Sequence, residues 1–283
     1  MSDYKIVYEK EVTSTNEICM ELGKNDHEGG YVLVAEAQTN GRGRLGRDWH
    51  SIEGKGLYMT ILERPERTYL RTVSRVTLVV AMALRKAVEE VIGMDCSIKW
   101  PNDIVYRGKK IAGILSQTAC HPLRQLPITE APTIDEVIKN AMEQEGIDYM
   151  GPFVEYFVVG IGLNLFHETF PEELQDKATS IYLENFCEKD DIDLKNRLII
   201  SIIENWKKYY FRFLDEDFYS LSDEYNEYLA GIDSEVVVHD PAGEYIGISL
   251  GVSPLGELEV ETADGIRTVS CGEVSVRGVN GYV

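Results

Sequence analysis

Cysteine, histidine and long apolar runs are scarce in this chain. Its 283 residues include five cysteines and five histidines, all scattered, without the close pairs that zinc ribbons or helical metal sites require. The longest uncharged apolar stretch is far below the ~20 residues that a membrane helix needs. The first ten residues mix acids with bases and contain no apolar signal core. The sequence therefore predicts a cytoplasmic protein with no membrane association, no disulfide framework and no metal held by protein side chains alone.

Basic residues are also in short supply. The chain has 28 Lys and Arg residues against 48 Asp and Glu residues, which leaves a net charge of −20. Such a charge repels nucleic acid and anionic lipid through its long-range field, so no nucleic-acid partner is expected. Hydrophobic residues make up 44% of the chain, enough for a sizeable core, and the length allows about two domains.

Mixed helix and strand patterns predict an α+β domain over residues 1–230. Ser14 and Glu17 form a capping box for a helix that Gly23 should end, and apolar spacing predicts a second helix over 73–91. The strands lack regular βαβ alternation, so we expect a largely antiparallel sheet with helices. The predicted strands are 31–37, 56–62, 97–100, 111–117 and 156–165, and the further helices are 194–213 and 218–229.

Two segments differ from this pattern. After Gly231, five short runs separated by Asp, Pro, Gly and Ser turns predict a small closed β-barrel over residues 231–283. Between 119 and 155 lies a proline-punctuated insert, in which residues 133–136 cap a predicted helix that reaches Gly146. We expect this insert to be a peripheral appendage, and a contact surface for the carrier protein or a second subunit is the alternative.

The loop from Gly41 to Trp49 concentrates three glycines and three arginines in an acidic protein. Glycines let backbone amides approach an anion, and guanidinium groups bind phosphate or carboxylate in a planar fork. The loop therefore predicts an anion site, with a solvated surface turn as the simpler alternative. Its G-x-G-x-x-G pattern does not predict a dinucleotide fold, because the strand at 56–62 follows too soon for a crossover helix.

Two further segments carry chemically useful side chains. Residues 99–103 read Lys-Trp-Pro-Asn-Asp, a strand that leads into a proline turn, and Lys110 lies three residues before Gly113, where another backbone or ligand can approach closely. Lys109 is more simply a solvated hairpin charge. Residues 160–164 read Gly-Ile-Gly-Leu-Asn, which offers small residues and an amide to a flat ring with a hydrogen-bonding edge.

The order of these segments resembles the biotin protein ligases, enzymes that attach biotin to a lysine of carboxylase carrier domains. In that family a Ser-Thr-Asn element, a Gln before an arginine loop, Lys-Trp-Pro-Asn-Asp, Lys-x-Ala-Gly-Ile and Gly-x-Gly-x-Asn follow one another, and all are present here. The resemblance covers nearly the whole chain. It implies the class II synthetase-like catalytic domain of biotin and lipoate ligases and a C-terminal Src-homology-like β-barrel. Because thirteen residues before Ser14 cannot hold a helix-turn-helix, it implies the ligase-only form without an N-terminal DNA-binding domain.

The resemblance assigns a role to each matching position. Lys110 faces the biotin carboxyl group and the phosphate, Asp103 is positioned toward the incoming carrier lysine, and Trp49 packs near the adenine. The catalytic residues implied are Lys110, Arg42, Arg44 and Asp103. The biotin-binding residues implied are Ser14, Thr15, Asn16, Gln38, Gly41, Arg42, Arg44, Gly113 and Ile114, and the adenylate-binding residues implied are Arg44, Arg47, Trp49, Lys110 and Asn164.

The implied reaction joins biotin to ATP as biotinyl-5′-AMP with release of pyrophosphate, and then transfers biotin to a lysine of a biotin carboxyl carrier domain with release of AMP. Positive side chains stabilise the charge on the phosphates, which share Mg²⁺. A lipoate or octanoate ligase or transferase of the same superfamily is the first alternative, and a biotin-sensing binding protein without ligase activity is the second. The sequence leaves open whether the chain forms a homodimer.

Overall fold

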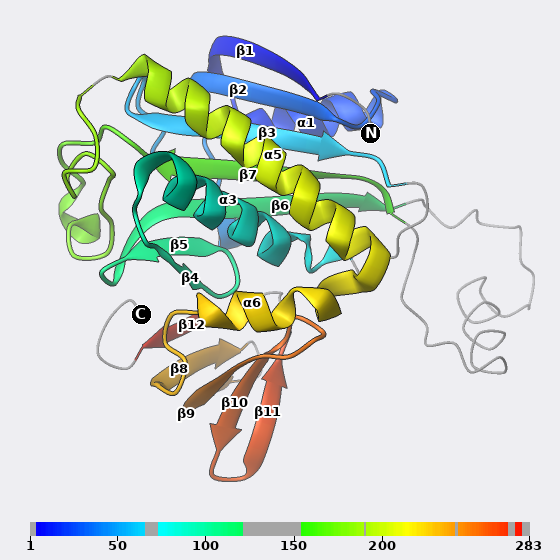
Figure 1. The fold of residues 1–283 in the computed structure, drawn as a ribbon, viewed down its shortest axis with the longest axis vertical. Helices are drawn as coiled ribbons and strands as arrows, with labels where there is room; N and C mark the ends of the chain where they lie inside the picture. Colours follow the sequence, from blue (N-terminus) through cyan, green and yellow to red (C-terminus); the bar gives the residue numbers. More distant parts are fainter. Residues whose placement is uncertain are drawn as a thin grey trace, which may run out of the picture.

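The computed structural model describes residues 4–65, 73–120, 154–189, 191–240, 243–270 and 275–278. These residues form a large sheet with helices on both faces and a smaller sheet next to one of its edges (Figure 1). The strand order is β1-β2-β3-β7-β6-β5-β4 in the large sheet and β11-β10-β9-β8-β12 in the small sheet. The predicted α+β class with a second, all-β part is confirmed.

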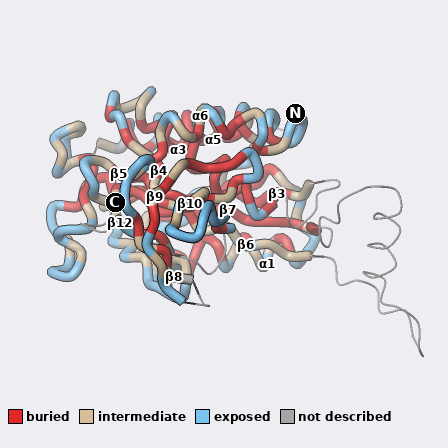
Figure 2. The backbone as a smooth tube through the Cα atoms, turned by 90° about the horizontal axis from the view of Figure 1, so that it is seen from below, coloured by how far each residue is buried: buried red, intermediate tan, exposed pale blue. Residues whose placement is uncertain are grey.

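The large sheet is antiparallel except at one edge. There β1 (Lys5–Val12) pairs in parallel with β2 (Tyr31–Gln38), and every later neighbour pairs antiparallel. All eight residues of β3 are buried and β7 is buried along nearly its whole length, which Figure 2 shows in red. The remaining strands of this sheet are β3 (Gly56–Glu63), β4 (Ser97–Lys99), β5 (Asp103–Tyr106), β6 (Lys109–Cys120) and β7 (Val154–Asn164).

Successive residues of β2 face opposite sides of the sheet. Val32 packs into the core formed with α3 (Val76–Ile92) and α5 (Ile192–Glu216). Leu33 instead packs with Cys19 of α1 (Thr15–Lys24). A period of two is what a strand covered on both faces requires. Helix α1 therefore lies on the face opposite α3 and α5.

The predicted start of α1 is correct, and its predicted end is wrong. Ser14 is the N-cap, with extended backbone, and its hydroxyl accepts a hydrogen bond from the backbone N–H of Glu17. Gly23 does not end the helix, which continues to Lys24. A Cβ at position 23 would lie 2.4 Å from the ring of Tyr156, so this glycine serves close packing against β7 and not helix termination.

Five short antiparallel strands follow Gly231, as the turn spacing predicts. Strands β11 and β12 are the edges of this small sheet. The indole N–H of Trp100, in the proline turn after β4, donates to the backbone carbonyl of Gly256 at 3.3 Å and so joins the large sheet to the small one. The five strands are β8 (Glu235–Asp240), β9 (Gly243–Val252), β10 (Leu258–Thr262), β11 (Gly265–Val269) and β12 (Ser275–Gly278), and α6 (Ser222–Glu227) precedes them.

The two strands that flank the predicted insert pair with each other up to its boundary. Cys120 at the end of β6 lies opposite Val154 at the start of β7. The predicted bounds of the insert, 119–155, are wrong at both ends, because Ala119 and Cys120 belong to β6 and Val154 and Glu155 belong to β7. Residues 121–153, with the helix predicted from 133 to 146, lie outside the described residues, and the position of the insert stays a prediction. No helix in the described ranges is long and apolar enough to cross a membrane.

Candidate functional site

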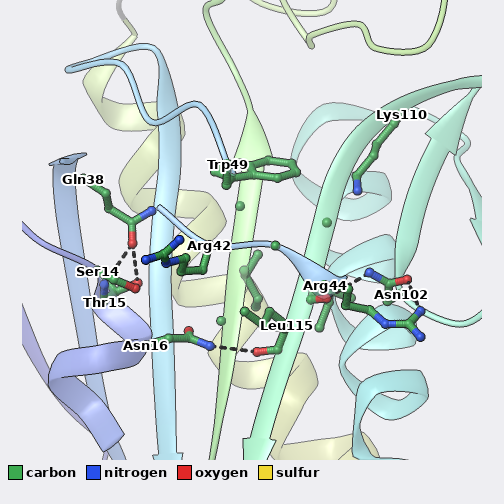
Figure 3. A pocket seen from close by; sticks show the side chains of 16 residues that line it. Ser14, Thr15, Asn16, Gln38, Arg42, Arg44, Trp49, Asn102, Lys110 and Leu115 are labelled. Carbon is green, nitrogen blue, oxygen red and sulfur yellow. Dashed lines mark hydrogen bonds between the residues drawn. The ribbon is translucent and has the colours of Figure 1, made fainter. Parts of the chain in front are cut away.

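A pocket lies between the start of α1, the arginine loop after β2, and the paired strands β6 and β7 (Figure 3). Its lining combines polar groups from several elements with small and aromatic residues, which suits a small-molecule ligand. Most of the side chains predicted for biotin or adenylate binding meet here although they are far apart in the sequence. The lining residues are Ser14, Thr15, Asn16, Gln38, Arg42, Gly43, Arg44, Trp49, Asn102, Lys110, Gly113, Ile114, Leu115, Gly160, Ile161 and Gly162.

One end of the pocket carries amides and hydroxyls. Gln38, the last residue of β2, accepts hydrogen bonds through Oε1 from the backbone N–H of Thr15 at 2.8 Å and from its hydroxyl at 3.1 Å (Figure 3). The amide nitrogen of Gln38 donates to the hydroxyl of Ser51 at 2.8 Å. These contacts fix the orientation of the Gln38 amide, whose second N–H is left to meet an acceptor on a ligand.

Asn16 forms the polar floor of this amide end. Its Nδ2 donates to the backbone carbonyl of Leu115 and to Oε1 of Gln117, both at 3.0 Å, and its Oδ1 accepts from the hydroxyl of Thr60 at 2.7 Å. A Cβ at Gly160 would lie 2.0 Å from Asn16 Oδ1. Only a glycine at that position of β7 leaves room for the buried amide, which ties α1 to β6 across the sheet.

The other end of the pocket, around Arg44 and Lys110, is cationic, and the arginine loop also brings Arg42 close to the amide end (Figure 3). The arginine loop is a tight hairpin in which the backbone N–H of Gly43 donates to the carbonyl of Arg47 at 2.7 Å. Leu45 at its tip has φ of 57°, which is uncommon for a residue other than glycine. The guanidinium of Arg42 lies 3.7 Å from carboxylates of Glu17 and Asp48. These half-exposed pairs leave Arg42 able to turn toward an anion, since exposed ion pairs are weak.

Arg44 is held more firmly than Arg42. Its Nη1 donates to Oδ1 of Asn102 at 2.9 Å, and Nδ2 of Asn102 donates to the backbone carbonyl of Ile114 at 3.1 Å. The backbone N–H of Ile114 in turn donates to the Asn102 carbonyl at 2.9 Å. Asn102 therefore anchors the arginine loop to β6. Asn102 belongs to the Lys-Trp-Pro-Asn-Asp motif, from which no role for this residue was predicted.

Lys110 points into the cationic end from the start of β6. Its Nζ lies 2.6 Å from Oδ1 of Asp103 and 5.1 Å from the ring centre of Trp49. A Cβ at Gly113 would lie 2.9 Å from both Lys110 Nζ and the Trp49 ring. Gly113 therefore allows both side chains to lie against β6, which is the close approach expected there.

Further positive charge surrounds Asp103. The pKa of Lys99 is lowered to about 8, chiefly by burial; Asp103 raises this pKa, and the charges of Lys110, Arg277 and Arg47 contribute to lowering it. Three segments of the large sheet and one strand of the small sheet thus bring cations to one region of an acidic protein. Such a concentration of charge favours a phosphate-bearing ligand.

The ring of Trp49 lies against β7 at Gly162, where a Cβ would be 2.5 Å from the indole Nε1. This Nε1 is buried and has no hydrogen-bond partner among the described residues. A buried donor without a partner costs free energy, so its presence calls for an explanation. An acceptor group on a bound ligand would satisfy it.

Four predicted site residues do not line the pocket. Gly41 packs against the carbonyl of Trp49, Arg47 is exposed at the end of the loop, and Asp103 reaches the site through Lys110. Asn164 is 5% exposed, and its Nδ2 donates to the backbone carbonyl of Thr179 at 3.0 Å. Within the described ranges, no group of three or more His, Cys, Asp and Glu residues is placed to hold a metal ion.

Both parts of the chain match known families. Residues 8–122 match the Biotin/lipoate A/B protein ligase family, and residues 231–277 match the Biotin protein ligase C terminal domain. The bifunctional ligase/repressor BirA of Bacillus spizizenii is 29% identical over 273 residues, which cover 96% of this chain and 74% of that protein. The biotin–[acetyl-CoA-carboxylase] ligase of Mycobacterium tuberculosis is 27% identical, with 87% of this chain and 78% of that protein covered.

Solved structures give the same grouping. The biotin protein ligase from Aquifex aeolicus in complex with biotin and ATP is 29% identical with a TM-score of 0.72, and the match covers 97% of this chain and 99% of that chain. The biotin protein ligase from Leishmania major in complex with biotinyl-5-AMP has a TM-score of 0.53 at 22% identity, with 94% of this chain and 98% of that chain covered. The second likeness concerns the fold alone.

Proposed function

Because the chain belongs to the biotin protein ligase family, we propose that it is an ATP-dependent enzyme that attaches biotin to a specific lysine of a biotin carboxyl carrier domain. Biotinyl-5′-AMP forms first with release of pyrophosphate, and AMP leaves in the transfer step. One observation carries the proposal: a single pocket has fixed amides at one end and Arg44 and Lys110 at the other, with Arg42 beside the amides. A ligand with a polar ring and a carboxylate matches both ends.

The amide end suits the ring of biotin. Its urea group presents a carbonyl acceptor between two N–H donors. The remaining N–H of Gln38 meets the acceptor, while the hydroxyl oxygens of Ser14 and Thr15 accept from the donors. A lipoyl ring of carbon and sulfur offers no such groups and would leave these polar atoms unpaired, which costs binding free energy.

The cationic end suits the activation step. The biotin carboxylate attacks the α-phosphate of ATP, and negative charge accumulates on the phosphate oxygens. Lys110 and Arg44 lie on either side of this part of the pocket and stabilise that charge electrostatically. We assign Mg²⁺ to the phosphate oxygens, since it commonly binds through substrate phosphates and keeps several waters. Arg42 and the loop then cover the reactive anhydride and exclude water.

The transfer step needs an amine nucleophile. The carrier lysine attacks the acyl carbon of the adenylate, and its proton has to leave. Asp103 lies beside Lys110, within the same part of the site, and orients or deprotonates the amine. Residues 1–230 supply both steps in this proposal, residues 231–283 form the second domain, and the enzyme acts in the cytoplasm.

The test is biotin-dependent exchange of labelled pyrophosphate into ATP. We expect exchange with biotin and Mg-ATP, and little exchange with lipoate or octanoate. Faster exchange with lipoate or octanoate would assign the chain to the lipoate branch of its superfamily. Biotin binding without any exchange would make it a biotin-sensing protein. Mass gain on a carrier domain, compared with a carrier whose acceptor lysine is replaced by arginine, tests the transfer step.

A further inference from the structure

Ser51 follows the arginine loop, and so far it has been described only as the acceptor that helps to hold the Gln38 amide. Its hydroxyl lies between two groups of the pocket wall, 2.8 Å from Nε2 of Gln38 and 3.2 Å from the backbone carbonyl of Trp49. Gln38 belongs to the amide end of the pocket, and Trp49 lies beside Lys110 at the cationic end. Ser51 is therefore a short bridge between the two ends.

The groups at the two ends of this bridge determine which atom donates in each hydrogen bond. The Trp49 carbonyl can only accept, so the Ser51 hydroxyl donates to it and accepts from Gln38. At the far side, the backbone N–H of Thr15 can only donate, so it must meet Oε1 of Gln38. Gln38 is thus held at both ends of its amide, and reversal of the amide would break both contacts.

The surrounding backbone leaves room for the bridge and little else. A Cβ at Gly41 would lie 2.4 Å from the Trp49 carbonyl oxygen and 2.7 Å from the Ser51 hydroxyl. The backbone N–H of Trp49 donates to the Gly41 carbonyl at 2.9 Å, which keeps the loop closed on this glycine. Gln38, Ser51 and the backbone of Trp49 are therefore in direct contact, with no space for an added side-chain carbon at Gly41.

We propose that Ser51 is a positioning residue that couples biotin at Gln38 to the placement of Trp49 beside Lys110. The inference rests on the proposed biotin-ligase function. The buried indole N–H of Trp49 has no hydrogen-bond partner within the described ranges, so it remains available to an acceptor group on a ligand. Small errors in the placement of reacting groups reduce rates strongly, so loss of the bridge acts on adenylation more than on biotin affinity.

The test compares Ser51→Ala, Ser51→Val and Ser51→Thr in the full-length protein. Valine and threonine have nearly the same shape, and only threonine keeps the hydroxyl. At saturating biotin and Mg-ATP, single-turnover formation of biotinyl-AMP should fall about tenfold in the alanine and valine variants, as expected for one lost hydrogen bond. Their Kd for biotin should change less than about threefold, and threonine should restore the rate to within about twofold of the parent protein.

A second measurement follows Trp49 itself. Biotin should change the tryptophan fluorescence of the parent protein, and Trp49→Phe should remove most of this change. Ser51→Ala should reduce the change although biotin still binds. Ile52→Ala, a substitution of the exposed neighbouring residue, is the matched control and should leave both readouts at the parent level.

Several outcomes overturn the inference. The first is an unchanged single-turnover rate in Ser51→Ala, and the second is equal rates for the valine and threonine variants. The third is a rate loss that is fully explained by a proportional increase in the Kd for biotin. If the alanine variant does not fold, the valine and threonine pair decides the question alone. Absence of biotin-dependent exchange in the parent protein instead refutes the proposed function, so the two failures are distinguishable.

Discussion

At the scale of single residues, the cationic end of the pocket is arranged before any phosphate arrives. The ammonium of Lys110 is held by the carboxylate of Asp103 across neighbouring strands, and Arg44 is held by Asn102. An incoming phosphate meets charges that already have defined positions, which reduces the reorganisation needed during the reaction. In the proposed mechanism, the phosphate competes with Asp103 for Lys110, and this competition would free the carboxylate for the carrier amine.

Lys110→Ala should slow single-turnover formation of biotinyl-AMP about a hundredfold or more, because one well-placed charge donor contributes about 3 to 4 kcal/mol at the transition state. The Kd for biotin should change far less. Lys109→Ala is the matched control, since the Lys109 ammonium is directed to the backbone carbonyl of Gln175 on the protein surface. An unchanged adenylation rate in Lys110→Ala would remove this lysine from the mechanism.

Gly160→Ala should disturb the floor of the amide end. The new Cβ would lie 2.0 Å from Asn16 Oδ1 and force that buried amide out of place, at a cost of about 1 to 3 kcal/mol of unfolding free energy. The affinity for biotin should fall as well. Urea unfolding and isothermal titration measure the two effects.

The double variant Gly160→Ala with Asn16→Ala is the control for this mechanism. Removal of the amide makes room for the new methyl group, so the double variant should be more stable than the sum of the two single effects predicts. Strictly additive losses would show that Gly160 acts on the backbone and not through Asn16.

At the scale of elements, the sequence predicts the long buried strands of the large sheet and misses its short or highly charged strands. Runs such as 31–37 and 156–165 are apolar because both faces of the sheet are covered, and both are found as strands. β1 was missed because most of its residues are charged or exposed, and its pairing with β2 depends on tertiary structure. β5 has four residues between two turns, too few for a periodic signal.

The candidate site shows the same division. The order of short motifs predicted most of the residues that line the pocket, since each motif has a recognisable composition. The contacts of Asn102 with Arg44 and of Ser51 with Gln38 were not predictable, because they depend on how the loop folds back on β2 and β6. Neither residue type carries a local signal for such a contact.

Replacement of residues 121–153 by a short glycine-containing turn should leave biotin-dependent pyrophosphate exchange nearly intact. Cys120 and Val154 are register partners, so a short turn can join β6 to β7 without opening the sheet. Exchange and biotin transfer to a carrier domain should be measured on the same folded preparation. Loss of exchange would show that the segment helps to build the site, and loss of transfer alone would identify it as a docking element.

At the scale of the whole molecule, burial of neutral groups makes stability depend on pH. His167, just after β7, is 4% exposed, and burial lowers the pKa of its imidazole to about 4. The unfolded chain takes up this proton below about pH 6.5, whereas the folded protein does not do so until about pH 4. Protons therefore favour the unfolded state across this window, and stability falls as the pH decreases through it.

His167→Phe should remove this part of the pH dependence. Between pH 7 and pH 5 the parent protein should lose roughly 2 kcal/mol of unfolding free energy because of His167, and the variant should lose correspondingly less. Urea unfolding at several pH values measures the difference. His27→Gln, at a histidine outside the core, should retain the parent slope, and an identical slope in His167→Phe would contradict the assignment.

The pairing of Cys120 with Val154 has a consequence for how the chain can be divided. Ser14, Gln38 and Lys110 precede this junction, whereas the pocket residues Gly160 to Gly162 follow it on β7. A polypeptide cut between 121 and 153 yields two fragments, and neither contains a complete pocket. Ligation by such fragments would require that the two fragments reassemble. If each fragment were fused to one of two proteins that bind each other, biotinylation of a carrier domain would report that the two proteins had associated.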